Sequence, residues 1–414
     1  MTLDSLQTGK SLTKSTVAND RVIGLGIAGL GMAGAVMVRA AAAHPGFALK
    51  GAADPHPGPR AAFGRDFGAA AHDDMAALCA DPAVEAIYIA TPHQFHRAHA
   101  VLAAEHGKHV ILEKPMALTL GDCDAIIEAT ERNGTHLIVG HTHAFDPAVR
   151  AMRGIIASGE IGRLGLIHSF NYTNYLYRPR RPEELDTAKG GGILFNQVPH
   201  QIDIVRLLAG GLVRNVRAGT GALDPSRPTE AHCSALLTFE DGAVASLVYS
   251  GYDHFDSDEW HFGVSERGAP KSIAHGAARR SLAQAQKQAG DEVRARTETF
   301  AYGHVRPETP PHQPHFGLTI ATCAEGDLRA SADGVFIYGR DGCREVPVPS
   351  AGGMSGRLQV LDDMAAAIRH GKKPIHDGRW GKATLEVALA VLQSARDGHD
   401  VTLRHQVAVN RMTD

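Results

Sequence analysis

The chain has 414 residues, of which 43% are hydrophobic and 21% are charged, and its formal net charge is −3 at pH 7. This length is enough for two domains with a sizeable core. The near-neutral charge argues against a nucleic-acid or membrane partner. In chain order, residues 1–19 come first, are polar and mixed in composition, and are expected to form a disordered tail.

The first organised segment runs from an apolar pair at 22–23 to Asp54. Its order is a strand, a G-x-G-x-x-G motif, an alanine-rich helix over 30–43, a strand over 47–53 and a closing acid. This order is typical of a dinucleotide-binding unit, in which glycines shape a tight turn and the helix N-terminus binds a diphosphate. The residues expected to bind there are Gly24, Gly26, Ile27, Ala28 and Gly29.

Each glycine of the motif has an expected role. Gly24 would permit the turn, Gly26 would let the backbone approach a pyrophosphate, and Gly29 would let helix and strand pack closely. Asp54 would accept hydrogen bonds from both ribose hydroxyls, which favours NAD over NADP because a 2′-phosphate would meet a carboxylate. An ordinary glycine-rich turn is the alternative interpretation.

The alternation of helix and strand continues through the next eighty residues. This pattern predicts a doubly wound parallel sheet over residues 20–146, of the Rossmann type. The expected helices cover 57–67, 73–79, 95–105 and 119–133, and the expected strands cover 84–90, 108–112 and 136–140.

Three polar breaks follow strands of this predicted sheet. In a parallel sheet the carboxyl ends of the strands meet at one edge, and ligands bind beyond that edge. We therefore expect the three breaks to converge on one crevice together with the glycine turn. The breaks are Thr91-Pro92, Glu113-Lys114-Pro115 and His141-Thr142-His143.

The pattern changes after residue 147. Residues 147–400 predict an α+β domain that binds substrate and forms oligomers, with a mostly antiparallel open sheet. Residues 266–315 are basic and then rich in proline and histidine, and are expected to form a surface insertion. The expected strands cover 165–173, 233–239, 243–250, 260–264, 316–322 and 334–338, and the expected helices cover 148–158, 193–208, 357–370 and 382–397.

Lys114 is the first catalytic candidate. Pro115 biases it away from helix, so that the lysine is held in extended backbone at the crevice. Burial there would lower its pKa and let it act as a proton acceptor or donor. The alternative is an ordinary lysine paired with Glu113.

His200 is the second catalytic candidate. On the helix expected over 193–208, Asn196, His200 and Asp203 are spaced by about one turn and can share one face. A histidine oriented by an acid is a common general base. We expect all three residues to contact substrate; the alternative is a core-facing helix with a satisfied histidine.

An arginine-rich loop lies between two prolines at 179 and 182. Arginine binds carboxylates through two parallel hydrogen bonds, so the loop suggests an anionic substrate. A solvated loop or an oligomer contact is the alternative. The expected substrate contacts are Tyr177, Arg178 and Arg180, together with His141 at the crevice.

The sequence contains 24 histidines, and those at 93, 96, 99, 141 and 143 invite a metal interpretation. No cysteine or dense set of carboxylates nearby completes a tetrahedral site, so we expect no metal. The five cysteines form no C-x-x-C pair, which fits a cytoplasmic protein with reduced thiols.

Taken together, these motifs resemble those of the Gfo/Idh/MocA oxidoreductase family. The resemblance implies a Rossmann domain that binds NAD(P), with contacts from Thr91, Pro92, His96, Glu113 and Lys114. It also implies a second domain whose open sheet forms homodimers or homotetramers, and places Lys114 and His200 beside the nicotinamide and the reacting hydroxyl. The residues that carry it are Gly24–Gly29, Asp54, Ala90–His96, Gly107–Val110, Glu113-Lys114-Pro115, Gly190–Gly192 and His200–Asp203.

Two positions depart from the family pattern. The family usually has an aspartate where this chain has Asn196, which puts the proton relay in doubt, and His141-Thr142-His143 replaces an Asn-Arg-Arg-like run. The runs 177–186, 315–317 and 326–329 are similar to the branch of phthalate dihydrodiol or 4,5-dihydroxyphthalate dehydrogenases.

These features support the hypothesis of an NAD-dependent dehydrogenase of a ring secondary alcohol. The substrate would be the cis-dihydrodiol of an aromatic carboxylate such as phthalate, or a sugar or cyclic polyol. An NAD-dependent glycosidase and a cofactor-binding regulator without activity are the alternatives.

Overall fold

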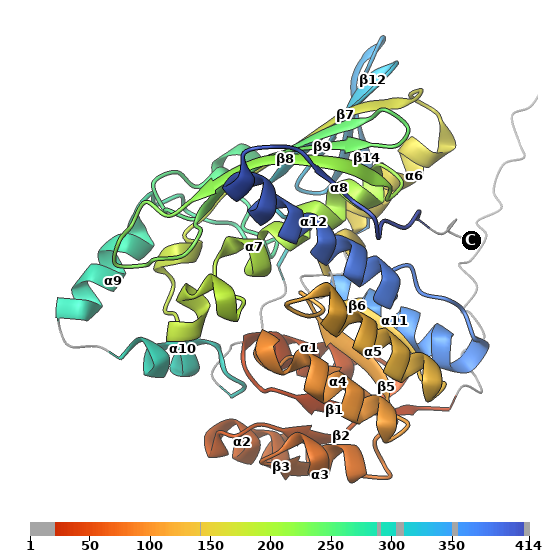
Figure 1. Cartoon of the computed structure of the whole chain (residues 1–414), viewed down its shortest axis with the longest axis vertical. Helices are drawn as coiled ribbons and strands as arrows, with labels where there is room; N and C mark the ends of the chain where they lie inside the picture. Colours follow the sequence, from red (N-terminus) through yellow and green to blue (C-terminus); the bar gives the residue numbers. More distant parts are fainter. Residues whose placement is uncertain (1–20, 141, 288–290, 304–309, 350–354, 410–414) are drawn as a thin grey trace, which may run out of the picture.

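A computed structural model describes residues 21–140, 142–287, 291–303, 310–349 and 355–409. Two sheets organise the chain, a smaller one at the bottom of Figure 1 and a larger one at the top, with helices packed around and between them. The predicted fold class is confirmed, because the first sheet is parallel and the second is mostly antiparallel. The expected tail at 1–19 and His141 lie outside the described residues.

The first domain has a six-stranded parallel sheet in the order β3-β2-β1-β4-β5-β6. The order reverses between β1 and β4, and in doubly wound sheets this switch point opens a crevice at the carboxyl ends of the strands. The strands are β1 (Ile23–Ala28), β2 (Phe47–Ala53), β3 (Ala70–His72), β4 (Ala86–Ile89), β5 (His109–Glu113) and β6 (Leu137–Gly140). The helices are α1 (Met32–Ala43), α2 (Pro57–Phe67), α3 (Met75–Ala80), α4 (His96–Glu105) and α5 (Leu120–Arg132).

A late helix completes the core of this domain. Val360, Leu361 and Met364 of α11 (Ser355–His370) are fully buried in the same apolar cluster as β1 and α1. The predicted boundary between the domains at residue 146 therefore leaves out α11, where the chain returns to the first domain. Local sequence patterns do not reveal this return.

The second domain has nine strands in the order β14-β13-β12-β11-β7-β10-β9-β8-β15. Only β7 and β10 pair in parallel, which makes the sheet mixed. The strands are β7 (Leu164–Tyr172), β8 (Val213–Gly221), β9 (His232–Phe239), β10 (Val244–Ser250), β11 (Leu318–Cys323), β12 (Gly326–Ala330), β13 (Gly334–Gly339), β14 (Gly342–Pro347) and β15 (Val401–Thr402).

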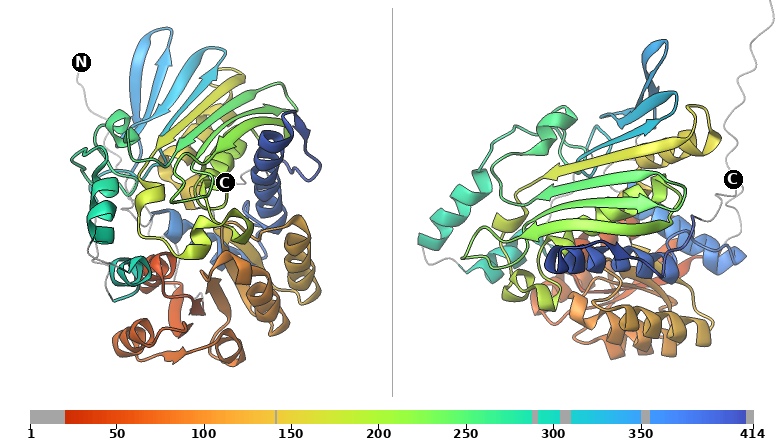
Figure 2. Two further views of the ribbon diagram at one scale, coloured as in Figure 1. Left: turned by 60° about the vertical axis from the view of Figure 1, so that its left-hand side comes forward. Right: turned by 45° about the horizontal axis from the view of Figure 1, so that its top comes forward.

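Helices cover one face of this sheet, as both views of Figure 2 show. Alternate residues of β9, such as Ala235 and Leu237, are buried against them, whereas Leu236 is exposed on the other face. The covering helices are α6 (Pro147–Ser158), α8 (Val198–Leu208) and α12 (Gly378–Asp397).

Several expected elements differ in the structure. The expected helix over 193–208 is divided at Gln197 into α7 (Ile193–Asn196) and α8. The strand expected over 260–264 is wrong: a 3-10 turn covers Ser257–His261, and Val264 forms an isolated bridge. The insertion contains two helices, α9 (Ala277–Lys287) and α10 (Glu292–Phe300).

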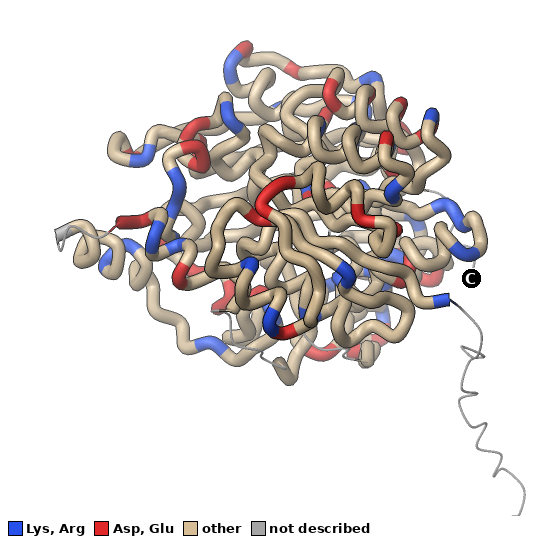
Figure 3. Tube along the Cα trace, turned by 90° about the horizontal axis from the view of Figure 1, so that it is seen from below, with Lys and Arg blue, Asp and Glu red and all other residues tan. Residues whose placement is uncertain are grey.

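Acidic and basic positions are interspersed over the face drawn in Figure 3. None of the helices in the described part of the chain is long and apolar enough to cross a membrane.

Candidate functional site

A cavity of about 540 Å³ lies at the carboxyl ends of the parallel strands. Its walls come from both domains, which is common for binding sites in proteins of this architecture. The first domain contributes the turn before α1, Asp54, Thr91 and Lys114, and the second contributes Asn196 and α10. Of the three polar breaks that were predicted to converge, two line this cavity. They are the breaks that follow β4 and β5.

The predicted register of the glycine motif is wrong. Gly24, Gly26 and Ile27 lie inside β1, and the chain turns only at Gly29 before α1 begins at Met32. Two residues, 22–23, are too few for a strand, so the strand takes up the first five of the six motif residues. The missed signal is a second, overlapping G-x-G-x-x-G over residues 29–34.

The second motif fits a diphosphate. Gly29 has a φ of +90°, and a Cβ there would lie 2.7 Å from Ala90 O. A Cβ on Gly31 would meet nothing within 4 Å, so the backbone is open to the cavity at this point. A Cβ on Gly34 would lie 1.9 Å from Gly29 O, which only glycine allows. These are the three glycine roles of a dinucleotide turn.

Asp54 lies beside this turn. One carboxylate oxygen accepts a hydrogen bond from Leu30 N at 2.7 Å, and the other accepts one from His56 N at 2.8 Å. The acid is thus held at the end of β2, where a bound dinucleotide would place its adenosine ribose. Ala28 and Gly29 also line the cavity.

His96 joins two strand ends. It is fully buried, with Nε2 2.9 Å from Thr91 O and Nδ1 2.9 Å from Pro115 O. It therefore supports the two breaks that carry Pro92 and Lys114. Glu113 accepts hydrogen bonds from Tyr88 OH and from Lys114 N, which directs its carboxylate back along β5.

Lys114 reaches across to the second domain. Its Nζ donates a hydrogen bond to Asn196 O at 2.6 Å. Burial lowers the pKa of Lys114, against the opposing charges of Glu113 and Glu266. A lysine with a lowered pKa is more readily neutral, and a neutral amine can accept a proton.

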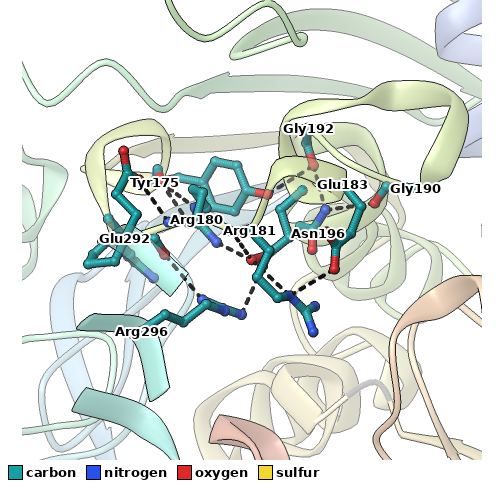
Figure 4. A network of polar contacts seen from close by, with 12 residues as sticks. Tyr175, Arg180, Arg181, Glu183, Gly190, Gly192, Asn196, Glu292 and Arg296 are labelled. Atoms are coloured by element: carbon teal, nitrogen blue, oxygen red, sulfur yellow. Dashed lines mark hydrogen bonds and ion pairs between the residues drawn. The ribbon is translucent and has the colours of Figure 1, made fainter. Parts of the chain in front are cut away.

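The Asn196 side chain explains the departure from the usual aspartate. Its Nδ2 donates hydrogen bonds to Gly190 O at 3.0 Å and Gly192 O at 2.8 Å, as Figure 4 shows. A carboxylate cannot donate to a carbonyl, so this glycine-rich bend requires the carboxamide.

We expect Asn196→Asp to lower stability without raising turnover. The new carboxylate would face two carbonyl oxygens, and losing both hydrogen bonds should cost about 2 kcal/mol of unfolding free energy. Urea denaturation measures this loss, with Asn215→Asp at a half-buried position of β8 as the control. A variant as stable as the parent, with a higher kcat, would contradict the assignment.

His200 packs in a ring cluster next to this contact. Its ring lies 4.7 Å from that of His143 and 4.8 Å from that of Phe316, measured between centroids. His143 Nδ1 is 2.8 Å from Asp146 Oδ2, and its Nε2 is 3.4 Å from Glu266 Oε1.

The charges of this cluster favour the protonated form of His143. Burial alone would lower its pKa, but Asp146 and Glu266 outweigh burial and raise the pKa to about 9. For Glu266 the effect of burial has the opposite sign and would raise the pKa of the carboxyl group. The hydrogen bond and charge of His143 outweigh burial and hold this pKa well below its usual range. Sequence reasoning included Phe316 only within the run 315–317 and an expected strand, and missed Glu266 as a site residue, because nothing local in their segments indicates proximity to the crevice.

The three loop residues predicted to contact substrate have different positions. The charge of Arg178 contributes to lowering the pKa of Glu266, and its Nε donates to Asn174 Oδ1 at 2.7 Å. Arg180 is buried, stacks on the Tyr175 ring at 3.7 Å and donates to Tyr175 O. The prediction for Arg180 is wrong, because its guanidinium is used inside the loop.

Tyr177 also has a structural role. It belongs to a small apolar cluster with Tyr252 and Leu282, and its OH donates to Asp224 at 2.7 Å. Arg279 lies 4.3 Å from its ring centroid. The second domain's insertion therefore covers the side chain that was expected to meet substrate.

The prediction for Asp203 is wrong as well. The residue is fully buried between α8 and α12, where it accepts a hydrogen bond from Trp380 Nε1 at 2.5 Å and lies 3.0 Å from His376 Nε2. Three residues advance a helix by about 300°, so His200 and Asp203 lie on adjacent sides rather than on one line. All residues of α8 are buried, so the helix has no exposed side. The spacing of residues along the sequence does not by itself indicate this.

In the described residues, no three metal-type side chains lie close enough together to hold an ion. His93 Nδ1 lies 3.1 Å from Gly190 O, and His99 Nδ1 lies 3.0 Å from Thr91 Oγ1. These histidines line or support the crevice through hydrogen bonds.

Comparisons with known proteins agree with this architecture. The chain is 40% identical over 356 residues to 1-carboxy-3-chloro-3,4-dihydroxycyclohexa-1,5-diene dehydrogenase of Comamonas testosteroni, covering 84% of this chain and 88% of that protein. It is 28% identical to D-apiose dehydrogenase of Paraburkholderia graminis, covering 80% of this chain and 76% of that protein. A crystal structure from Bordetella bronchiseptica RB50 has a TM-score of 0.87 at 46% identity, covering 92% of this chain and 100% of that one.

More distant structures share the fold. Levoglucosan dehydrogenase, solved with NADH and levoglucosan, has a TM-score of 0.71 at 21% identity and covers 92% of this chain and 99% of that one. A family model described as an oxidoreductase family with an NAD-binding Rossmann fold matches residues 23–141, and the C-terminal model of the same family matches 149–265. With both domains matched, the chain belongs to the Gfo/Idh/MocA family of NAD-binding oxidoreductases.

Proposed function

We propose that this oxidoreductase is an NAD-dependent dehydrogenase of a ring secondary alcohol, and that its substrate is the cis-dihydrodiol of an aromatic carboxylate. The observation that carries the proposal is the contact of Lys114 Nζ with Asn196 O, which brings a lysine of lowered pKa from the cofactor domain to the ring cluster of the second domain.

The chain's own residues have distinct roles in this proposal. Lys114 accepts the hydroxyl proton as the C–H bond breaks, and His200 holds the hydroxyl oxygen from the opposite domain. The turn at 29–34 would hold NAD, whose nicotinamide would supply the hydride acceptor. A cis-dihydrodiol oxidised at one carbon gives a hydroxyketone that rearomatises to a catechol, which drives the oxidation.

One cationic group supports an anionic ring substrate. The charge of Arg178 acts on Glu266 at the ring cluster, and a guanidinium binds a carboxylate through two parallel hydrogen bonds, whereas His143 is already paired with Asp146 and Glu266. The printed name of the Comamonas testosteroni relative describes a carboxylated ring dihydrodiol. A sugar or cyclic polyol is the broader class within the same proposal.

We further propose a homodimer or homotetramer acting in the cytoplasm. The uncovered face of the large sheet carries exposed apolar side chains, which are suited to a contact between copies; they include Leu236, Trp260, Phe262 and Tyr338. Light scattering of the purified protein would test this, and a monomer at micromolar concentration would contradict it.

The experiment that tests the function follows NADH absorbance with aromatic cis-dihydrodiols, with and without a ring carboxylate, and with cyclic polyols. We expect NADH to form fastest with a carboxylated dihydrodiol. Arg178→Gln should remove most of that preference while leaving NAD binding unchanged. Tight NAD binding without turnover of any alcohol would favour a regulator, and sugar release without net NADH would favour a glycosidase.

A further inference from the structure

One wall of the cofactor cavity comes from α10, in the segment expected to be a surface insertion. The residues of α10 and its end that line the cavity recur at intervals of three and four positions, so they form one helix face. They are Val293, Arg296, Thr297, Phe300 and Ala301. Val293 is 41% exposed, which is unusual for an apolar side chain that points toward a cavity between two domains.

The C-terminal end of α10 is attached to the glycine turn itself. Tyr302 N donates a hydrogen bond to Leu30 O at 2.8 Å, and Tyr302 OH donates to Asp66 at 2.9 Å. Its ring packs against Phe63 and Phe67 of α2. The insertion therefore contacts the loop that would hold the diphosphate.

The other end of α10 is attached to the second domain. Both carboxylate oxygens of Glu292 lie 2.7 Å from Arg227 Nη2, and one accepts a hydrogen bond from Arg180 N at 3.0 Å. Arg296 Nη2 lies 2.8 Å from Glu184 Oε1. Figure 1 shows α10 between the two domains at the side of the sheet, and Figure 4 shows the contacts of Arg296 and Glu292.

Positive charge is in excess at this wall. Four arginines gather around three carboxylates in the described residues of this wall: Arg180, Arg181, Arg227 and Arg296 around Glu183, Glu184 and Glu292. Burial, together with repulsion from the two neighbouring arginines, lowers the pKa of Arg296 to about 10 against the opposing charge of Glu184. An anion on the cavity side would relieve this repulsion.

We propose that Arg296 binds the diphosphate of NAD, and that α10 closes the groove over the dinucleotide. The proposal rests on NAD being the cofactor. Arg296 lies five positions before Ala301, which follows the C-terminal end of α10. Five positions of a helix span about 7.5 Å, so the Arg296 guanidinium stays within reach of a ligand that lies on the glycine turn. The diphosphate carries the negative charge of NAD and can therefore satisfy a guanidinium at this place.

The test titrates the full chain with ADP-ribose, which contains the diphosphate, and with adenosine, which does not. Calorimetry measures the first ligand and saturation-transfer NMR the second. We expect Arg296→Gln to weaken ADP-ribose about 10- to 100-fold and to leave adenosine unchanged, since a charge-assisted hydrogen bond to phosphate is lost. Arg296→Lys should restore part of the affinity.

Arg294→Gln is the matched control, because Arg294 lies on the same helix, is 75% exposed and pairs with Glu298. It should not change either affinity. Val293→Asp is a second test at an exposed position: its carboxylate should repel the diphosphate and weaken ADP-ribose, and an acid in the first turn of a helix does not harm folding.

The outcomes separate the two hypotheses. If the parent protein itself binds no ADP-ribose, the cofactor assignment and this inference are both overturned. If the parent binds but Arg296→Gln and Val293→Asp bind equally well, this inference alone is overturned. If Arg296→Gln weakens adenosine as much as ADP-ribose, Arg296 is only a structural part of the wall, and the diphosphate contact is wrong.

Discussion

Replacing Lys114 with methionine should lower kcat about 1,000-fold while NAD still binds. A positioned acid or base contributes about 10²- to 10⁴-fold to the rate of a reaction. In the proposed mechanism, Lys114 is the described group that lines the cofactor cavity and contacts the second domain at Asn196 O. Methionine keeps the length of the side chain and removes only the amine. Steady-state NADH formation and calorimetric NAD titration measure the two effects separately.

Lys108→Met is the matched control. Lys108 is also a buried lysine whose Nζ donates to backbone carbonyls, those of Asp81 and Val84, but it does not line the cavity. Its loss should lower the melting temperature and leave turnover per folded molecule nearly unchanged. A Lys114→Met enzyme within tenfold of the parent rate would show that the proton goes elsewhere.

The same lysine gives a pH dependence. Lys114 must be neutral to accept a proton, and burial lowers its pKa from the usual 10.5. The rate of alcohol oxidation should therefore rise with pH through this lowered pKa, below the range of a free lysine, and then level off. The rise should be absent from the remaining activity of Lys114→Met.

Gly31→Val should lower NAD affinity at least about 100-fold and leave the fold intact. A Cβ at this position meets nothing within 4 Å, and the φ of Gly31 is −70°, so a side chain can leave the backbone here without strain. The same space is where a diphosphate would approach the backbone, and two charge-assisted hydrogen bonds lost together correspond to this loss of affinity.

Two glycine variants serve as controls for this result. Gly154→Val on α6 also meets nothing within 4 Å, lies outside the cavity, and should bind NAD normally. Gly26→Ala would crowd Leu78 and Val84 inside β1, so it should lower the melting temperature rather than the affinity of the folded protein. Equal NAD affinity for Gly31→Val and the parent would place the diphosphate away from this turn.

Local patterns in the chain were sufficient for the fold class and for naming residues that line the crevice. The alternation of strands and helices, Asp54 after the second strand, and Lys114 before a proline are each readable within a few residues, because strand and helix periods and turn residues are local properties. They correctly indicated a Rossmann domain and an open second sheet, and the resemblance of the motif set to a known family correctly indicated the oxidoreductase family.

Long-range packing settled the rest. Whether β1 ends before or after Gly26 depends on its pairing with β2 and β4, and the direction of Asp203 depends on Trp380, which is 177 residues away. Arg180 turns into its own loop and Arg296 reaches the cavity because contacts distant in sequence hold each of them there. Side-chain direction on a helix or loop that is covered from several sides follows from these neighbours and not from spacing.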